Sequence, residues 1–428
     1  MSTTGRPADV ESTAAAIESA DFVRVIARAD GDSLAASGVL ARALDGRAIP
    51  FQVSVAATIG DRTTRATDGD DLTIVVGASD ASTDQVRQLE ASDRPASLLA
   101  CDLVGELADA NSDSDADADT DEGEGDDESE RTAGSGSRPE PDPVLALAGA
   151  FAAGVEPGAG ETEWLLESAI DRGLLARRPG IAVPTDDLAD GLAYTTQCRG
   201  PWSGDLEATR EILAELGLSK SQADAHSDAE STITDDDHRR LGSVVALDVV
   251  GDEDVSTRGA TAIARLLRPY ETSTERFATV GGYADVLEAT ARHAPGLGVA
   301  LAMGHDVHES ALDAWREHGR RAHAALDGAS TGRYDGLFVV GVDDGPVETV
   351  ARLAAAFRSP EPLVLAIGDG EAAVATIDAR PLEGALEAVA RDLSLGADYD
   401  VGRRRGYVRF DAADVDDATI ISAVRETL

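Results

Sequence analysis

The chain has 428 residues, and its 80 Asp and Glu outnumber its 37 Lys and Arg, which gives a formal net charge of −43. Such acidity is typical of adaptation to a very salty cytoplasm, where a Debye length of about 3 Å at molar salt screens self-repulsion; mimicry of nucleic acid is the weaker alternative. Two cysteines exclude a disulfide framework, and no apolar run approaches the about 18 residues of a membrane span. We therefore expect a cytoplasmic protein without a signal peptide.

The first part of the chain alternates apolar, strand-like segments with helical ones. The predicted helices are 11–20, 33–44, 143–154 and 161–174, and the predicted strands are 22–28, 50–55, 71–77 and 97–101. Strands separated by helices are typical of a parallel sheet with helices on its faces. The predicted fold class is therefore α/β.

The second part repeats this alternation. The predicted strands are 243–250, 297–303, 336–343, 362–367 and 373–377, with a long helix at 307–327. Residues 108–142 are nearly all acidic or small, which predicts a disordered surface insertion, with a tethered interaction segment as the alternative.

Composition and patterning predict five segments. These are an N-terminal helix or tail at 1–20, an α/β domain at 21–218 that carries the insertion 108–142, a polar linker at 219–240, a connecting region at 241–300, and a smaller C-terminal α/β domain at 301–428.

The first candidate site is ARADGDSLAASG, at 27–38, which follows a buried strand and enters a helix. Asp30 and Asp32 therefore lie at the carboxyl end of a strand, where open α/β sheets place their sites. Two carboxylates at this spacing can face one hard cation such as Mg²⁺ or Mn²⁺. In a chain so rich in Asp, an Asp-rich turn with a helix N-cap explains the pattern as well.

The same segment resembles the first motif of the DHH phosphoesterase superfamily, a His-x-Asp-x-Asp-Gly turn followed by a helix of small residues. Asp30 and Asp32 match the two aspartates, whereas Arg28 stands at the His position and Ser33 at the Gly position. The resemblance implies a parallel-sheet DHH-like domain joined to a DHH-associated C-terminal domain.

Further positions follow from this resemblance. Asp80 lies just beyond the strand that carries an isolated metal-binding Asp in the superfamily, and Asp102 matches the Asp of the Asp-His-His signature. Leu103 and Val104 occupy the two signature His positions, and Asp171 is a match for the fourth acidic position.

The resemblance extends along the chain. Segments 199–213 and 278–304 are similar to archaeal RecJ-like proteins, while 400–410 lacks the His of the superfamily's Gly-Gly-His turn. The resemblance implies association with the GINS complex and the MCM helicase, as in archaeal relatives.

These departures predict a degenerate metal centre. Two-metal hydrolysis needs lone-pair ligands around cations about 4 Å apart, whereas Arg28 is a permanent cation and Leu103 and Val104 offer no ligand atom. No histidine precedes His226. We therefore assign no catalytic residue, and expect at most a weak Mg²⁺ or Mn²⁺ site, with no metal required. Its remnant ligands would be Asp30, Asp32, Asp102 and Asp171.

The densest basic segment contains Arg403, Arg404, Arg405, Tyr407 and Arg409. It predicts contact with a phosphate backbone, with Tyr407 stacking on a base. The alternative is a strand edge or turn whose arginines pair with the chain's many carboxylates.

Three functions follow from the residues and the resemblance. The first is a non-catalytic replication or repair factor that binds single-stranded DNA or RNA, GINS or MCM. The second is an active metal-dependent single-strand exonuclease or phosphoesterase that uses Asp30, Asp32, Asp80, Asp102 and Asp171. The third is a non-replicative binding protein of the same fold.

Overall fold

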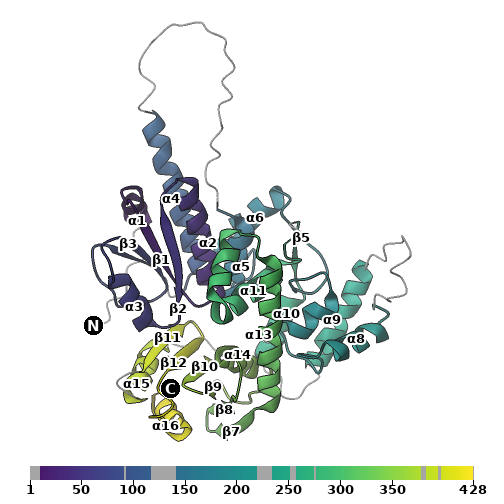
Figure 1. Cartoon of the computed structure of the whole chain (residues 1–428). Helices are drawn as coiled ribbons and strands as arrows, with labels where there is room; N and C mark the ends of the chain where they lie inside the picture. The colour runs from purple at the N-terminus through teal and green to yellow at the C-terminus, as the bar shows by residue number, and fades with distance from the viewer. Residues whose placement is uncertain are drawn as a thin grey trace, which may run out of the picture.

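The computed structural model describes residues 10–90, 93–116, 141–218, 234–250, 257–273, 276–376, 382–393 and 397–427. It contains a four-stranded sheet and a six-stranded sheet joined by a helical region (Figure 1). No helix in these described ranges combines the length and apolar character needed to cross a bilayer.

The elements fall into three groups along the chain. The first contains α1 (Val10–Glu18), β1 (Val23–Arg28), α2 (Gly31–Gly46), β2 (Phe51–Ala56), α3 (Ile59–Thr67), β3 (Leu72–Val76), β4 (Val86–Leu89), α4 (Ala96–Ala116), α5 (Pro143–Ala152), η1 (Gly160–Thr162) and α6 (Glu163–Asp171). The second contains β5 (Leu175–Arg177), α7 (Leu188–Tyr194), α8 (Leu206–Glu215), α9 (Asp235–Val250), α10 (Thr257–Leu266), β6 (Tyr270–Thr272), α11 (Val280–His293), α12 (Pro295–Met303) and α13 (His308–Gly328). The third contains β7 (Ser330–Tyr334), β8 (Leu337–Gly341), α14 (Val347–Phe357), β9 (Leu363–Gly368), β10 (Glu371–Thr376), α15 (Glu383–Leu393), β11 (Asp398–Gly402), β12 (Arg405–Arg409) and α16 (Asp417–Thr427).

The N-terminal sheet is entirely parallel, in the order β2-β1-β3-β4. All five residues of β3 are buried, as expected for a strand covered on both faces. The small side chains of α2 allow this helix to pack closely against α4, α5, α11 and α12. This group confirms the predicted parallel α/β sheet.

Three predicted strands are wrong. Residues 97–101 begin α4, residues 243–250 end α9, and residues 297–303 lie in α12. Each is a short apolar run, and such a run fits a buried helix as well as a buried strand. The fourth strand of the sheet is instead β4, whose sequence VRQL carries too little apolar pattern to be recognised.

The predicted disordered insertion begins too early. Residues 108–116 continue α4, and Asp142 caps α5 by accepting hydrogen bonds from Val144 and Leu145. Residues 117–140 lie outside the described residues, as do 219–233 of the predicted linker.

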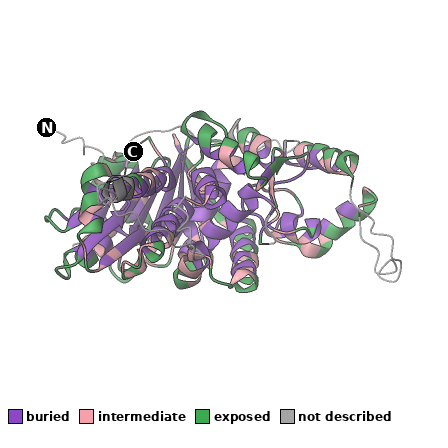
Figure 2. Cartoon of the chain, turned by 90° about the horizontal axis from the view of Figure 1, so that it is seen from above, coloured by how far each residue is buried: buried purple, intermediate pink, exposed green. Residues whose placement is uncertain are grey.

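The C-terminal sheet has the strand order β11-β12-β10-β9-β8-β7, in which only β8 and β9 run parallel. Helix α14 packs against β9 and β10, whereas α15 packs against β11 and β12 and also contacts α16. Figure 2 shows buried residues concentrated in the strands and in the helix faces turned towards them. The predicted smaller C-terminal α/β domain is therefore confirmed.

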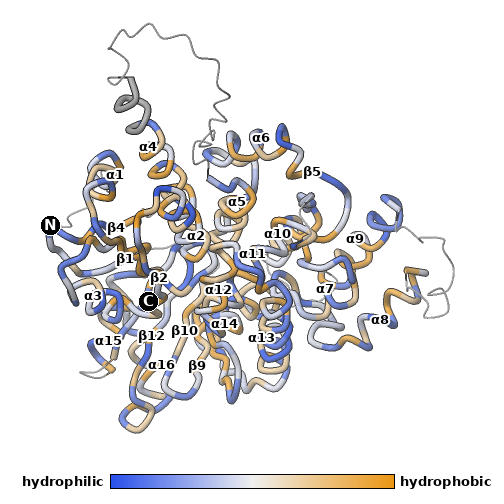
Figure 3. Tube along the Cα trace, turned by 45° about the horizontal axis from the view of Figure 1, so that its top comes forward, coloured by the Kyte–Doolittle hydropathy of each residue, from blue (hydrophilic) through white to orange (hydrophobic). Residues whose placement is uncertain are grey.

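Helix α13 connects the two sheet regions. Its buried residues recur at helical spacing and face α7, α11 and α14. Figure 3 shows many hydrophilic residues along the same helix. Gly319 lies on the buried face, where an added Cβ atom would stand 2.0 Å from the Tyr194 carbonyl oxygen. This close approach requires glycine.

Gly319→Ala is therefore expected to lower the free energy of unfolding by about 1–3 kcal/mol, because the backbone of α7 must move. Gly328→Ala in the same helix is the matched control, since an added Cβ there meets nothing within 4 Å. Denaturant unfolding of both variants in molar KCl provides the measurement. Equal stabilities would contradict the close packing of α13 on α7.

Candidate functional site

The candidate site lies where β1 meets α2, at the carboxyl edge of the parallel sheet. Asp30 is the N-cap of α2, in extended conformation, and its Oδ1 accepts a 2.7 Å hydrogen bond from the Ser33 amide. Only 5% of Asp30 is exposed. The local alternative of an N-cap is therefore confirmed, and it leaves the second carboxylate oxygen available.

That second oxygen faces two guanidinium groups. Asp30 Oδ2 lies 3.1 Å from Arg28 Nε and 2.9 Å from Arg405 Nη2. Arg28 Nε also lies 2.8 Å from Oδ2 of Asp400, which projects from β11. The space between the carboxylates of the two sheet regions is thus filled by arginine.

Asp400 has a second arginine partner. Its Oδ1 lies 2.5 Å from Nη2 of Arg62 on α3, and Arg62 is fully buried. The remaining Arg62 donors reach the carbonyl oxygens of Ala78 at 2.7 Å and Ala56 at 3.2 Å. Asp400 itself is 2% exposed, so this ion pair is shielded from solvent.

Glu288 of α11 completes the cluster. Its Oε2 accepts a 2.8 Å hydrogen bond from the Gly31 amide, and its Oε1 pairs with Arg405 of β12. We call Arg28, Asp30, Arg62, Glu288, Asp400 and Arg405 the arginine–carboxylate cluster. It ties the N-terminal sheet, α11 and the C-terminal sheet together.

Electrostatics keep these carboxylates ionised. Burial alone would raise the pKa of Asp30, but Arg28 and Arg405 outweigh it and hold that pKa below its ordinary value. The same competition lowers the pKa of Asp400, where Arg28 and Arg62 prevail over burial. Each carboxylate is therefore neutralised by guanidinium groups of the chain itself.

This donor set does not fit a two-metal centre. A divalent cation beside Asp30 would meet the permanent charges of Arg28 and Arg405. Within the part of the chain that the structure describes, no group of three or more His, Cys, Asp or Glu is arranged to hold a metal. The chemistry of the cluster is ion pairing.

Asp32 makes different contacts from those of Asp30. Its carboxylate accepts hydrogen bonds from the amides of Ala96 at 2.6 Å and Ser97 at 3.0 Å, which places it on the first turn of α4. Burial and the nearby charge of Asp30 raise the pKa of Asp32 to about 7, although the Ser97 and Ala96 donors act in the opposite direction.

A pH dependence follows from Asp32. Because its pKa is higher in the folded state than in the unfolded chain, the stability that it contributes is present below about pH 4 and is lost as pH rises through 7. We expect the free energy of unfolding to fall by roughly 2–4 kcal/mol across this window on account of Asp32. Asp32→Asn should flatten this fall in denaturant titrations from pH 4 to 8. The exposed control Asp313→Asn should keep the wild-type slope, and a slope that Asp32→Asn leaves unchanged would contradict the assignment.

The other predicted acidic residues lie apart from the cluster. Asp102 is on α4 and pairs with Arg94 at 2.5 Å, and Asp171 is exposed at the end of α6. Asp80 is exposed, and its amide donates to Thr63 Oγ1 at 2.9 Å. Of the four proposed remnant ligands, only Asp30 and Asp32 are placed together.

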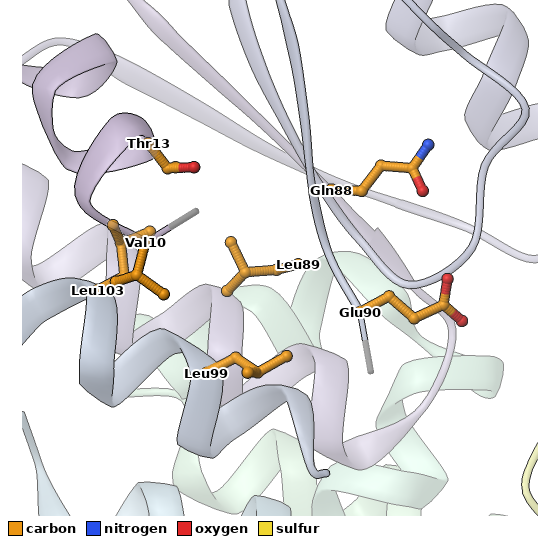
Figure 4. A pocket seen from close by; sticks show the side chains of 7 residues that line it. All are labelled: Val10, Thr13, Gln88, Leu89, Glu90, Leu99 and Leu103. Carbon is orange, nitrogen blue, oxygen red and sulfur yellow. The ribbon is translucent and has the colours of Figure 1, made fainter. Parts of the chain in front are cut away.

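Because residues 97–101 are helical, the fourth strand of the sheet is β4. Glu90 follows β4, and its carboxylate is close enough to Arg28 and Arg62 to interact with both. In Figure 4, Gln88 and Glu90 point away from the side chain of Leu89. Glu90 is therefore the acidic residue that directly follows β4, whereas Asp102 lies on α4.

The pocket in Figure 4 lies beside the end of β4 and is lined in part by Gln88, Leu89 and Glu90. Its lining includes Val10, Thr13, Leu99 and Leu103, and its volume is about 10 Å³. That is about the room needed by one water molecule, so this pocket is too small for a nucleotide.

The residues of the basic segment differ in their contacts and exposure. Arg405 belongs to the arginine–carboxylate cluster, and Arg409 pairs with Asp61 at 2.9 Å. Tyr407 is 9% exposed, and its hydroxyl donates to Glu371 at 2.9 Å, so its ring is not available to stack on a base. Arg403 and Arg404 are exposed, and for these two the phosphate contact stays a prediction.

Sequence reasoning missed Arg62, Glu288 and Asp400. One signal for Arg62 was present, since it shares the buried face of α3 with Ile59 and Ala66 at helical spacing. A charged residue at such a position requires a buried partner. Nothing local distinguishes Asp400 or Glu288 from the chain's many other acidic residues.

Comparisons with known proteins agree with this architecture. Residues 329–426 match the family model described as the C-terminal domain of uncharacterized protein rrnAC1427. The Haloarcula marismortui protein of that name is 40% identical over 438 residues, which cover 100% of both chains.

Two solved structures resemble the whole chain. CDC45 from Entamoeba histolytica has a TM-score of 0.57 at 7% identity, with 97% of each chain covered. Exonuclease RecJ bound to manganese has a TM-score of 0.47 at 12% identity, with 99% of this chain and 94% of that chain covered. The CDC45 likeness shows a shared fold over nearly the full length.

Proposed function

The chain belongs to the family of the Haloarcula marismortui protein rrnAC1427 and has the DHH phosphoesterase fold, and we propose that it is a non-catalytic replication or repair factor. In this role it binds single-stranded nucleic acid or replisome partners in a salty cytoplasm. It requires no metal, although a weakly held Mg²⁺ or Mn²⁺ is compatible with the role.

One observation carries the non-catalytic part of the proposal. The guanidinium groups of Arg28 and Arg405 lie within 3.1 Å of Asp30, at the strand end where the superfamily's first motif holds metal. Hydrolysis through two metals needs those carboxylate oxygens as ligands. In this chain, the Asp30 carboxylate pairs with Arg28 and Arg405 instead.

The partner part of the proposal is supported by the fold and by the resemblance. The likeness to CDC45 covers 97% of this chain and 97% of that chain. Archaeal RecJ-like proteins, which the sequence resembles at 199–213 and 278–304, associate with GINS and MCM. These two assemblies are therefore the partners that we propose.

A pull-down tests the partner proposal. The tagged full-length chain is incubated with extract of its own cells in molar KCl, and the recovered proteins are identified by mass spectrometry. Recovery of GINS or MCM subunits is expected. If neither is recovered while single-stranded DNA still binds, the chain is a binding protein outside the replisome.

A further inference from the structure

A short two-stranded ribbon carries more positive than negative charge, which is the reverse of the chain as a whole. We call residues 174–182 and 266–273, which include β5 and β6, the arginine ribbon. The whole chain has 80 Asp and Glu against 37 Lys and Arg. The charged residues of the ribbon are instead three basic ones and one acidic one, namely Arg177, Arg178, Arg268 and Glu271. A local excess of positive charge in so acidic a chain indicates contact with an anion.

Hydrogen bonds join the two segments of the ribbon along their length. β5 and β6 pair antiparallel, with Arg177 directly opposite Tyr270. Further along the two segments, the Ala182 amide donates to the Leu266 carbonyl oxygen at 2.8 Å. Ala182 and Leu266 are buried, whereas the three arginines of the ribbon are exposed. A paired and partly buried backbone therefore holds three exposed guanidinium groups on one short stretch of surface.

One arginine of the ribbon stacks on an aromatic ring. The guanidinium carbon of Arg177 lies 5.6 Å from the centre of the half-buried Tyr270 ring. Arg268 precedes Tyr270 by two residues, so their Cα atoms are at most about 7 Å apart. Arg178 contributes less charge, because its Nε lies 3.3 Å from Oε2 of Glu271. The ribbon thus combines a flat Arg–Tyr pair with a second exposed guanidinium close by.

A second Arg–Tyr pair in the chain has acidic surroundings. The guanidinium carbon of Arg425 lies 5.2 Å from the centre of the Tyr334 ring, and Tyr334 is 37% exposed. The segments that carry this pair, 330–336 and 417–427, contain two arginines and three acidic residues, namely Arg333, Arg425, Asp335, Asp417 and Glu426. The excess of positive charge therefore distinguishes the ribbon from the other pair, which serves as a matched control.

The chemistry of the ribbon favours a nucleic acid over an acidic peptide. In the salty cytoplasm that the composition predicts, the attraction between arginine and any anion is screened, so binding through charge alone weakens steeply. Stacking of a base on an aromatic ring or on a guanidinium plane does not depend on net charge. An acidic peptide offers carboxylates but no bases. A ligand with both phosphates and bases therefore suits Arg177, Tyr270 and Arg268 better.

We propose that the arginine ribbon binds single-stranded nucleic acid, with a base stacked on the Arg177–Tyr270 pair and with Arg268 on the phosphate backbone. Guanidinium groups suit phosphate because they donate paired hydrogen bonds to its oxygens. The ribbon shares no residue with the arginine–carboxylate cluster, so a strand binds there while the cluster stays paired. This inference rests on the proposed nucleic-acid binding and identifies where the strand is held.

The test measures the anisotropy of labelled oligothymidine with the full-length chain, over a series of KCl concentrations in which circular dichroism shows it folded. Arg268→Gln is expected to weaken binding roughly fivefold and to reduce the slope of log K against log salt by roughly 0.7. Tyr270→Leu is expected to weaken binding roughly tenfold with the slope unchanged, whereas Tyr270→Phe keeps the ring and should bind as wild type does. The control Arg425→Gln, from the second Arg–Tyr pair, should also bind as wild type does.

The outcomes separate failure of the ribbon from failure of the function. If wild type binds DNA and Arg268→Gln and Tyr270→Leu bind it equally well, the ribbon is wrong and the proposed function stands. If wild type binds no DNA, both fail. Should Tyr270→Leu lose its folded spectrum, Arg177→Gln at an exposed position takes its place and is expected to weaken binding roughly tenfold.

Competition with polyglutamate identifies the class of ligand. Polyglutamate at the same concentration of charges is expected to leave the DNA bound to wild type, because it has no bases to stack on the Arg177–Tyr270 pair. Displacement of the DNA by polyglutamate would assign the ribbon to an acidic protein partner and overturn this inference. It would leave the partner part of the proposed function in place.

Discussion

Asp400→Asn is expected to lower the free energy of unfolding by about 3–5 kcal/mol, the largest effect of any single change considered for this chain. Asp400 neutralises Arg62, which is fully buried, and it also lies 2.8 Å from Arg28. The Asn side chain has the same shape and keeps the packing, but it removes the negative charge that neutralises the guanidinium groups of Arg62 and Arg28. The cost is that of an uncompensated buried cation.

Asp344→Asn is the matched control. Asp344 also pairs with an arginine, Arg321, at 2.5 Å, but its side chain is 80% exposed. An exposed pair of this kind contributes about 0–1 kcal/mol. Urea unfolding in molar KCl should therefore separate the two variants clearly, and a loss of the same size in both would show that the cluster is not what joins the two sheet regions.

Arg28→Ala is expected to have two effects, a loss of stability and a gain of metal sensitivity. The loss should be about 3 kcal/mol, because Asp30 and Asp400 each lose one of two arginine partners while buried. The gain follows because the vacated space then lies between two ionised carboxylates. Millimolar Mn²⁺ should raise the melting temperature of this variant and leave that of wild type unchanged.

The control for this prediction is Arg210→Ala, which removes an arginine that is 52% exposed and pairs with Glu207 on α8. It should lose less than about 1 kcal/mol and gain no response to Mn²⁺. Thermal melts with and without the ion in molar KCl make the comparison. A wild-type melting temperature that already rises with Mn²⁺ would mean that Arg28 does not exclude metal.

The parts of the fold that could be predicted were those with unambiguous patterns. The strands β1, β2 and β3 and the helix α2 lie where the alternation of apolar and small residues placed them. Residues 97–101 failed because an apolar run of that length is compatible with helix or strand. Because of that error, Asp102 was expected at the end of a strand, whereas it lies on α4.

Only the residues of the site that are close together in the sequence could be predicted. Asp30 and Arg28 are neighbours in the chain, so their conflict with a metal centre could be recognised from the sequence. Asp400 and Arg405 reach them across more than 370 residues. Such pairing depends on how two sheets dock, and among 80 acidic residues no local feature identifies the partner.

The most direct test of the central claim is Mn²⁺ binding by calorimetry in molar KCl, performed beside digestion of labelled single-stranded DNA with the same preparation. We expect no tight binding and no cleavage, because arginine occupies the space that two metals would need. Tight binding of two Mn²⁺ ions with metal-dependent cleavage would contradict the account. It would show that the carboxylates of the arginine–carboxylate cluster bind metal instead of pairing with arginine. The chain would then be a nuclease.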